Sequence, residues 1–246
     1  MPYERMIITR RAVADDEAFR DRPGWGESHE LEIELAIHSN SSGTLIVNYP
    51  GYNGDIAGYN NKYEKIADML QQRNVGAVVR IPNDHFVGFD YRKSVQENLR
   101  CVVDYTLESG ERICGSRTPR LYIMGFSSGA SAIAAICADY EQLDKILLVA
   151  PSGDAGKEAV EKGLSRYLGE VYVTIGENDE VVRPQSGQMF YDLATAARKR
   201  ELVVVPHCDH QFRGEINGKI MSKAPLWAFT SDETYPSPEG GIVLYE

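Results

Sequence analysis

Three short segments contain residues that could together perform nucleophilic catalysis. The first is the segment 125–129, Gly-Phe-Ser-Ser-Gly, in which Ser127 lies midway between two glycines. The second contains Asp179 and the third contains His210, each in a polar stretch that follows an apolar run. A serine hydroxyl is a poor nucleophile until a base takes its proton, and the base needs an acid to orient it. The order serine, acid, histidine therefore predicts that Ser127 attacks a substrate with the help of the other two residues.

The surroundings of Ser127 have the pattern strand, sharp turn, helix. A short apolar run, 121–124, precedes the segment, and the small residues of 130–136 follow it. This is the G-x-S-x-G nucleophile elbow in the structural context that it requires. A Cβ atom two residues to either side of the serine would collide with the crossing chain. The turn is expected to hold the hydroxyl at a helix N-terminus, where backbone N–H groups lack intrahelical partners.

Neighbouring residues compete for the roles of acid and base. Glu177 and Glu180 lie beside Asp179, and an acid that follows a strand often only caps a helix. His207 directly follows the apolar run that precedes His210, and its alternative interpretation is a buried, hydrogen-bonded residue. The Asp-His-x-Phe pattern of 209–212 favours His210, and Asp179 is favoured by the family resemblance described below.

Strand and helix patterns alternate through most of the chain. Two N-terminal segments, 5–10 and 31–37, indicate strands, and the second alternates polar and apolar residues as a half-exposed antiparallel strand does. Continuous apolar runs indicate buried strands at 44–49, 75–81, 121–124, 145–150, 171–175 and 202–205. Helices are predicted at 60–72, 91–108, 130–136 and 185–199, with a weaker one at 214–229 interrupted by Pro225. The predicted fold class is α/β, with a mostly parallel sheet, helices on both faces, antiparallel N-terminal edge strands and one domain over residues 1–246.

The order and spacing of these motifs resemble the α/β-hydrolases, in the compact lidless form of dienelactone hydrolases and small carboxylesterases. The resemblance covers about 44–229. The segment 176–184 resembles the acid loop of that family, and 209–212 resembles its histidine loop. The turn at 51–52 resembles its oxyanion loop, although a proline stands where the family usually has the histidine of His-Gly.

This resemblance implies a role for each matched residue. Ser127 would be the nucleophile, His210 the general base and then the general acid, and Asp179 the residue that orients the imidazole. The backbone N–H groups of Ser128 and Tyr52 would form the oxyanion hole. The implied activity is that of a carboxylesterase-like serine hydrolase, which cleaves an ester or related acyl bond through an acyl-enzyme. The same triad serves thioesterases, peptide and amide hydrolases and acyltransferases, and a ligand-binding homologue without turnover is a further alternative.

The interval in which many α/β-hydrolases carry a lid is short in this chain. It runs over 151–170 and has room for a single amphipathic helix, so no large lid is expected. The pocket should then be open or built from loops. The candidate wall residues are Tyr52, Phe86, Phe126 and Val181, and Arg183 is the nearest candidate cation for an acidic group on a substrate. The segment 84–86 follows a strand, but an ordinary polar loop is its preferred interpretation.

Composition limits the partners of the chain. The 246 residues include 36 acidic and 26 basic ones, and the formal net charge of -10 argues against nucleic acid or an anionic membrane as the main partner. A small-molecule acyl substrate is expected instead, and self-association as a homodimer is left open. The sequence contains neither a metal-binding motif nor a nucleotide fingerprint, so neither a metal nor another cofactor is expected.

The cysteines and the N-terminal segment predict a cytoplasmic protein. The four cysteines are scattered, without a C-x-x-C pair, and reduced thiols are expected. The first residues contain no apolar signal-peptide core, and no apolar run approaches the roughly 20 residues that span a bilayer. Two histidines in the N-terminal part, His29 and His38, are expected to be solvated.

Overall fold

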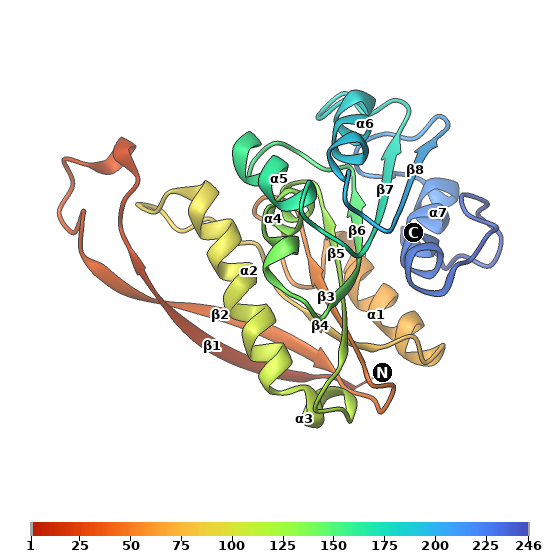
Figure 1. Ribbon diagram of the computed structural model, residues 1–246, viewed down its shortest axis with the longest axis horizontal. Helices are drawn as coiled ribbons and strands as arrows, with labels where there is room; N and C mark the ends of the chain where they lie inside the picture. The colour runs from red at the N-terminus through yellow and green to blue at the C-terminus, as the bar shows by residue number, and fades with distance from the viewer. Residues whose placement is uncertain (1, 246) are drawn as a thin grey trace.

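Eight strands form one sheet in the order β1-β2-β4-β3-β5-β6-β7-β8. The structure is a computed structural model that describes residues 2–245 (Figure 1). The strands are β1 (Glu4–Val13), β2 (Ser28–His38), β3 (Thr44–Tyr49), β4 (Ala77–Arg80), β5 (Arg120–Phe126), β6 (Leu143–Val149), β7 (Glu170–Gly176) and β8 (Lys199–Val205). β1 pairs antiparallel with β2, and β2 pairs antiparallel with β4, whereas the other neighbours are parallel. The predicted mostly parallel sheet with antiparallel N-terminal strands is confirmed.

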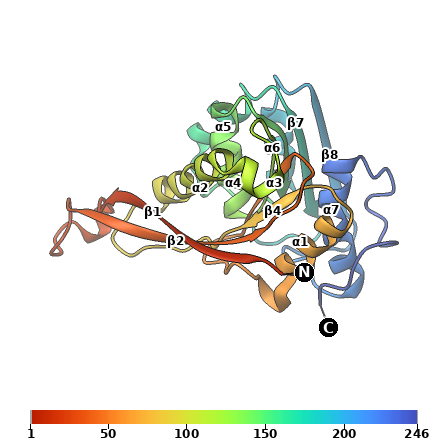
Figure 2. The same cartoon turned by 90° about the horizontal axis from the view of Figure 1, so that it is seen from below.

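Helices cover both faces of the sheet, because the buried strands are apolar on both sides. One face packs against α2 (Tyr91–Glu108), α3 (Gly110–Cys114), α4 (Ser128–Ile136), α5 (Lys157–Leu164) and α6 (Pro184–Leu193). The other face packs against α1 (Lys62–Gln72) and α7 (Glu215–Thr230), as Figure 2 shows from below. The short helices η1 (Glu17–Phe19), η2 (Tyr59–Asn61) and η3 (Cys137–Asp139) complete the list. None of the helices in residues 2–245 is both long enough and apolar enough to cross a membrane.

Two predicted helices differ from the observed ones. The helix predicted at 185–199 ends at Leu193, because the Arg198 N–H donates to the carbonyl of Gly169 at 3.1 Å and the chain enters β8 at the next residue. The charged residues 198–201 at the start of β8 resemble a helix surface in the sequence. α7 is not interrupted at Pro225, which lies inside it among buried residues. Packing against the sheet compensates for the hydrogen bond that proline cannot donate.

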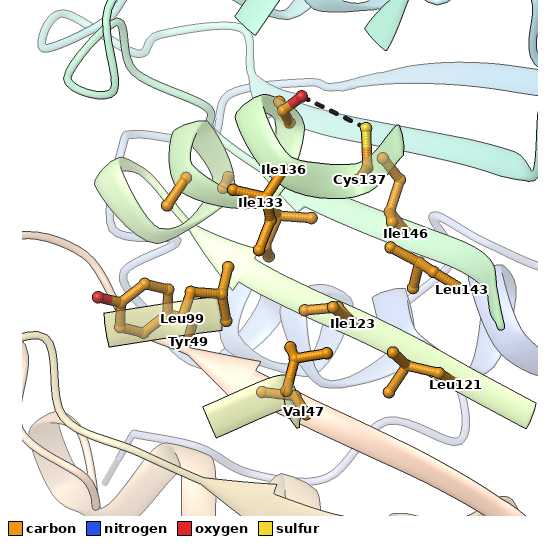
Figure 3. Packing of buried hydrophobic residues seen from close by; sticks show 14 of the residues in the cluster. Val47, Tyr49, Leu99, Leu121, Ile123, Ile133, Ile136, Cys137, Leu143 and Ile146 are labelled. Carbon is orange, nitrogen blue, oxygen red and sulfur yellow. Dashed lines mark hydrogen bonds between the residues drawn. The ribbon is translucent and has the colours of Figure 1, made fainter. Parts of the chain in front are cut away.

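The core around α4 explains how the segment after Ser127 is held in place. All residues of α4 are buried, and Figure 3 shows Ile133 and Ile136 directed toward the apolar side chains of the strands below. Ile123 of β5 and Ile146 of β6 belong to the same cluster. At the end of the helix, the Cys137 thiol donates to the carbonyl of Ala134 at 3.3 Å (Figure 3). The helix is therefore fixed along its whole length.

We expect Ile133→Ala to lower the free energy of unfolding by about 2–5 kcal/mol. The side chain of Ile133 is fully buried, so its removal leaves a cavity between α4 and the sheet. Urea denaturation followed by circular dichroism measures the change. Ile216→Ala is the control, because Ile216 is 64% exposed and should cost no more than about 0.5 kcal/mol. Equal losses in the two variants would contradict the assignment of the core.

The β1–β2 hairpin extends away from the rest of the molecule (Figures 1 and 2). Its ladder runs from the pair Glu4–Ile37 to the pair Val13–Ser28. β2 pairs with β4 over only three residues, 36–38. The outer part of the hairpin packs on a small separate cluster that contains Leu31 and Phe89. The hairpin is thus joined to the main sheet at one end only.

The C-terminal segment covers the face of the molecule that carries α1 and α7. The apolar residues 242–244 could by sequence form a late edge strand or part of an interface, and the structure shows that residues 231–245 contain no strand, so the edge strand is wrong. Leu244 is fully buried, and its carbonyl accepts from Asn60 Nδ2 at 3.0 Å and from Lys65 Nζ at 3.2 Å. The Ile242 N–H donates to Ser222 Oγ of α7 at 3.0 Å. These contacts attach the segment to both helices.

Candidate active site

Ser127 occupies the sharp turn between β5 and α4. Its backbone has φ 52° and ψ −113°, a sparsely populated conformation that persists only when the surroundings impose it. Its N–H donates to the carbonyl of Val149 at 2.9 Å, and its carbonyl accepts from the N–H of Ser152 at 3.2 Å. The end of β6 therefore holds both backbone groups of Ser127.

The two glycines of the elbow are required by close approaches of the chain. A Cβ atom at Gly129 would collide with the carbonyl oxygens of Tyr49 and Pro50 at the end of β3. A Cβ atom at Gly125 would lie 2.8 Å from the carbonyl carbon of Gly129, across the turn. The reason given by the sequence for the G-x-S-x-G spacing thus agrees with the observed packing.

Asp179 and His210 form a buried pair at the carboxyl ends of β7 and β8. Asp179 Oδ2 and His210 Nδ1 are 2.7 Å apart, and the two residues are only 3% and 6% exposed. The other carboxylate oxygen, Oδ1, accepts from the N–H groups of Val181 and Val182, each at 3.0 Å. The His210 ring contacts the ring of Phe126, with centroids 5.0 Å apart. Because Phe126 precedes Ser127, the imidazole lies beside the elbow.

The competing acids and the competing histidine lie outside this pair. Glu177 and Glu180 are exposed, and Glu177 Oε2 accepts from the backbone N–H of His207 at 2.9 Å. The side chain of His207 is 91% exposed, so its interpretation as a buried residue is wrong. His207 has a positive φ of 54° and makes the turn that follows β8. This turn directs its ring into solvent.

The loop after β3 approaches the elbow closely. A Cβ atom at Gly51 would lie 3.2 Å from Phe126 Cδ1 and 3.4 Å from Ser127 Cβ, so the loop passes directly beside the elbow. The loop turns back through a hydrogen bond from the Gly54 N–H to the Gly51 carbonyl, at 2.9 Å. Ser128 is the first residue of α4, and its N–H has no intrahelical acceptor. The backbone of Tyr52 and Ser128 thus flanks Ser127, and their role as oxyanion donors remains a prediction.

A polar aromatic cluster beside the elbow was not predicted from the sequence. The hydroxyl of Tyr91 lies 2.5 Å from Ser128 Oγ, and burial raises the pKa of Tyr91 to about 12. The hydroxyl of Tyr52 lies 2.9 Å from His85 Nδ1, and the His85 and Tyr91 rings are in contact, with centroids 5.4 Å apart. Asn83 Nδ2 donates to the carbonyl of Pro50 at 3.1 Å, which ties the loop after β4 to the oxyanion loop. The one sequence signal for this cluster was the polar segment 84–86, which follows the buried strand predicted at 75–81.

The predicted pocket residues are not all near Ser127. Phe126 contacts His210, and Val181 is 64% exposed on the loop that carries Asp179. Arg183 is exposed, and in the described part of the chain it forms no ion pair with the neighbouring acids. Phe86 instead packs against Phe89 of the hairpin cluster, with ring centroids 6.4 Å apart. The structure therefore does not bring Phe86 to the elbow.

One N-terminal histidine is buried, contrary to the expectation that it is solvated. His38 is fully buried, and Arg80 Nε donates to its Nε2 at 3.0 Å. Burial first, and then the charge of Arg80, lower the pKa of His38 to about 4. The last three residues of β2 pair with β4, so both faces of this end of the strand are covered. The alternating pattern could not show this change along one strand.

A bound metal is not suggested by the side chains. Within residues 2–245, no group of three or more His, Cys, Asp or Glu residues could hold a metal ion. The four cysteines are free thiols, and three of them are buried. The arrangement at the elbow is thus one of a serine, an imidazole, a carboxylate and backbone N–H groups.

Comparison of the sequence with known proteins gives limited information. No family model matches the chain. One characterised protein, autocrine proliferation repressor protein A of Dictyostelium discoideum, is 29% identical over 102 residues. This match covers 33% of the present chain and 21% of that protein, so the chain corresponds to only about a fifth of its length.

Comparison of the structure is more informative. A dienelactone hydrolase from Anabaena variabilis superposes with a TM-score of 0.63 at 16% identity, over 81% of this chain and 93% of that one. Est1E from Butyrivibrio proteoclasticus gives a TM-score of 0.60 at 14% identity, over 79% and 91% of the two chains. An α/β serine hydrolase homologue from Coxiella burnetii gives 0.57 at 19% identity, over 74% and 85%. Together with the strand order and the elbow, these likenesses show that the chain has the α/β-hydrolase fold.

Proposed function

We propose that this protein is a serine hydrolase that cleaves a carboxylic ester or a related acyl bond through an acyl-enzyme on Ser127. The observation that carries the proposal is the buried 2.7 Å contact between Asp179 Oδ2 and His210 Nδ1, beside a serine on a strained strand-to-helix turn. If the Asp179–His210 pair only stabilised the fold, it would not require a serine in a strained backbone conformation beside it. The three residues come from separate loops at one edge of the sheet, where ligands bind in parallel α/β folds.

In the proposed reaction, His210 Nε2 accepts the proton of Ser127 as Oγ attacks the substrate carbonyl carbon. Asp179 holds the proton on Nδ1 and stabilises the imidazolium that forms. The tetrahedral intermediate collapses when the alcohol leaves with the proton from His210. Water then attacks the acyl-enzyme with His210 again as the base, and the carboxylic acid and free Ser127 are regenerated.

The oxyanion of the intermediate would be stabilised by backbone N–H groups. Ser127 cannot supply its own N–H, because that group already donates to the Val149 carbonyl. The remaining donors are Ser128 at the start of α4 and Tyr52 in the loop beside it. Asn83 and Tyr91 would position these donors, since Asn83 binds the Pro50 carbonyl and Tyr91 contacts Ser128 Oγ. One such donor is typically worth roughly 10²–10³ in turnover.

The interval between β6 and β7 supports an accessible site. It contains α5 and short loops, and α5 packs on α4 rather than over the elbow. Small and medium-sized acyl compounds could therefore reach Ser127 directly. Thioesters, amides and transfer of the acyl group to another acceptor use the same residues, and turnover across a panel of these substrates separates them.

We expect a fluorophosphonate probe to label the folded protein at Ser127, because the probe reacts with activated serines and mimics the tetrahedral intermediate. Mass spectrometry of the digested protein locates the adduct. Labelling should disappear in Ser127→Ala and in protein unfolded with urea before the probe is added. A folded protein that remains unlabelled would contradict the proposal and favour a ligand-binding protein without turnover.

A further inference from the structure

A groove with a volume of about 970 Å³ opens beside the proposed catalytic histidine. Gln211 and Arg213, from the loop that carries His210, form one side of it. Tyr59 and Lys62, at the start of α1, and Tyr245, in the C-terminal segment, form the rest. We call it the Lys62 groove. Its position next to His210 makes it a place for the part of a substrate that extends away from the reacting bond.

Lys62 is a buried cation without a counter-ion in the described part of the chain. The residue is only 7% exposed, and its ammonium group forms no hydrogen bond or salt bridge with residues 2–245. Its nearest partners are the rings of Phe126 and Tyr63, whose centroids lie 4.7 and 5.0 Å from Nζ. Aromatic faces stabilise a cation, but less than a carboxylate does. An anion that enters the groove would therefore stabilise the charged ammonium group of Lys62.

The other charged side chains of the groove already have partners. Arg213 lies 3.5 Å from Asp209, and its side chain is 73% exposed. Glu215 lies 2.6 Å from Lys219, one turn further along α7. Lys62 is thus the one cation of the groove that remains to be neutralised among the residues described.

The remaining walls of the groove are largely apolar. The rings of Tyr59 and Tyr245 lie 6.0 Å apart, and Val243 beside them is 43% exposed. The Tyr245 hydroxyl donates to the carbonyl of Gln211 at 2.9 Å, which joins the C-terminal segment to the loop of His210. Such walls suit an alkyl or aromatic chain that separates the reacting carbonyl from the anionic end.

We propose that the Lys62 groove binds the free carboxylate of an ester substrate, with Lys62 as its counter-ion. The inference rests on the proposed hydrolase function and names the substrate class, which is esters that carry one carboxylate several bonds away from the scissile carbonyl. A carboxylate is favoured over a phosphate dianion because only one cation of the groove is unpaired. Phe126 contacts both Lys62 and His210, and so couples the anion site to the reacting centre.

The first test compares mono-para-nitrophenyl esters of glutaric, adipic and suberic acid with their methyl-capped, neutral counterparts of equal length. In the wild-type protein, kcat/KM for the anionic ester should exceed that for the neutral one by about 10- to 100-fold at the best chain length. In Lys62→Met this ratio should fall to about one, and in Lys62→Arg it should be partly retained. Lys157→Met is the matched control, since it removes an exposed lysine at the start of α5 and should leave the ratio unchanged.

A direct binding measurement separates this inference from the hydrolase proposal. Calorimetry with monomethyl suberate, carried out in the Ser127→Ala background so that the ester is not cleaved, should give heat of binding with Ser127→Ala alone and combined with Lys157→Met, and at least about tenfold weaker binding when it is combined with Lys62→Met. Wild-type turnover of neutral esters without any preference for anionic ones would overturn the groove proposal and leave the hydrolase intact. If the protein binds the carboxylate through Lys62 but hydrolyses no acyl substrate, the proposed hydrolase function is overturned and the proposed carboxylate site is retained. Tighter binding of methyl phosphate than of the carboxylate would also overturn the proposed substrate class.

The pH dependence gives a second measurement that needs no variant. Burial lowers the pKa of Lys62 to about 8, while the negative charge of Asp55 opposes this shift. The amine is charged below that pKa and neutral above it, so the ratio of anionic to neutral kcat/KM should be constant near pH 7 and fall above pH 8. Because kcat/KM reports the pKa of the free enzyme, the bound carboxylate does not move this fall. The titratable groups around Lys62 are Asp55, Tyr59, Tyr63, Arg213, Glu215 and Tyr245. The neutral ester reports the effect of pH on the reaction itself in the same buffers, and a ratio that stays constant up to pH 10 would overturn the role of Lys62.

Discussion

Ser127→Ala is expected to lower kcat for a para-nitrophenyl ester by about four to six orders of magnitude. Alanine removes the oxygen that would form the acyl-enzyme and leaves the backbone of the elbow unchanged. The oxyanion donors and the substrate site would still accelerate attack by water slightly. Steady-state hydrolysis of para-nitrophenyl butyrate, with active protein counted by fluorophosphonate titration of the wild type, measures the loss.

The matched control for this variant is Ser41→Ala. Ser41 is exposed in the turn before β3, at the opposite end of the sheet from the elbow, and its loss should change kcat less than about twofold. Circular dichroism should be the same for the two variants. Retention of more than a tenth of the wild-type activity in folded Ser127→Ala would rule out Ser127 as the nucleophile.

Asp179→Asn is expected to lower kcat by about 10³–10⁴ at neutral pH. The carboxylate would accept a hydrogen bond from the His210 Nδ1–H across 2.7 Å, whereas an amide that is held by the Val181 and Val182 N–H groups would present its NH₂ to the ring. The imidazole would then carry its proton on Nε2, where the base is needed. The substitution is nearly isosteric, so the loss should appear without a large change in stability.

Glu177→Gln provides the control for Asp179→Asn, because Glu177 is an acid of the same loop that contacts His207 instead. It should retain at least about half of the wild-type kcat. A large loss in Glu177→Gln together with full activity in Asp179→Asn would transfer the orienting role to the other loop residue. Single-turnover measurements would show whether acylation is the affected step.

The sequence predicted the sheet and the contact of the Asp179 loop with the His210 loop because both depend on local signals. Continuous apolar runs mark buried parallel strands, and the carboxyl ends of such strands meet at one edge of the sheet. The short loops after β7 and β8 must therefore lie at the same edge as the turn that carries Ser127. The G-x-S-x-G spacing records a close approach of Gly129 to the end of β3, which any sequence with this turn must satisfy. The choice of Asp179 and His210 over their neighbours rested on the resemblance of their loops to the acid and histidine loops of the α/β-hydrolases, and the contact between the two residues agrees with it.

Features that depend on distant parts of the chain could not be predicted in this way. Lys62 looks like an ordinary polar residue at the start of an amphipathic helix, and the groove around it forms only when the C-terminal segment returns over α1. His38 belongs to an alternating strand, and its burial follows from the pairing of the last residues of β2 with β4. The position of Phe86 is set by the hairpin, which approaches the loop after β4 from outside the sheet.

Because the β1–β2 hairpin is attached to the main sheet at one end only, we expect the chain not to unfold as a single cooperative unit. In the outer half of the ladder Arg10 of β1 pairs with Leu31, and its Nε donates to Asn98 Oδ1 of α2 at 2.5 Å. Beyond this point the hairpin rests on the small cluster around Leu31 and Phe89 and on a few contacts of the next residues, such as the hydrogen bond from the Asp90 N–H to Asp15 Oδ1 at 3.1 Å. Local opening requires little free energy where few buried contacts are lost, so the outer hairpin can open while β3 and β5 remain paired. Ser127 lies in the slowly opening unit, and its strained backbone is thereby insulated from fluctuations of the hairpin.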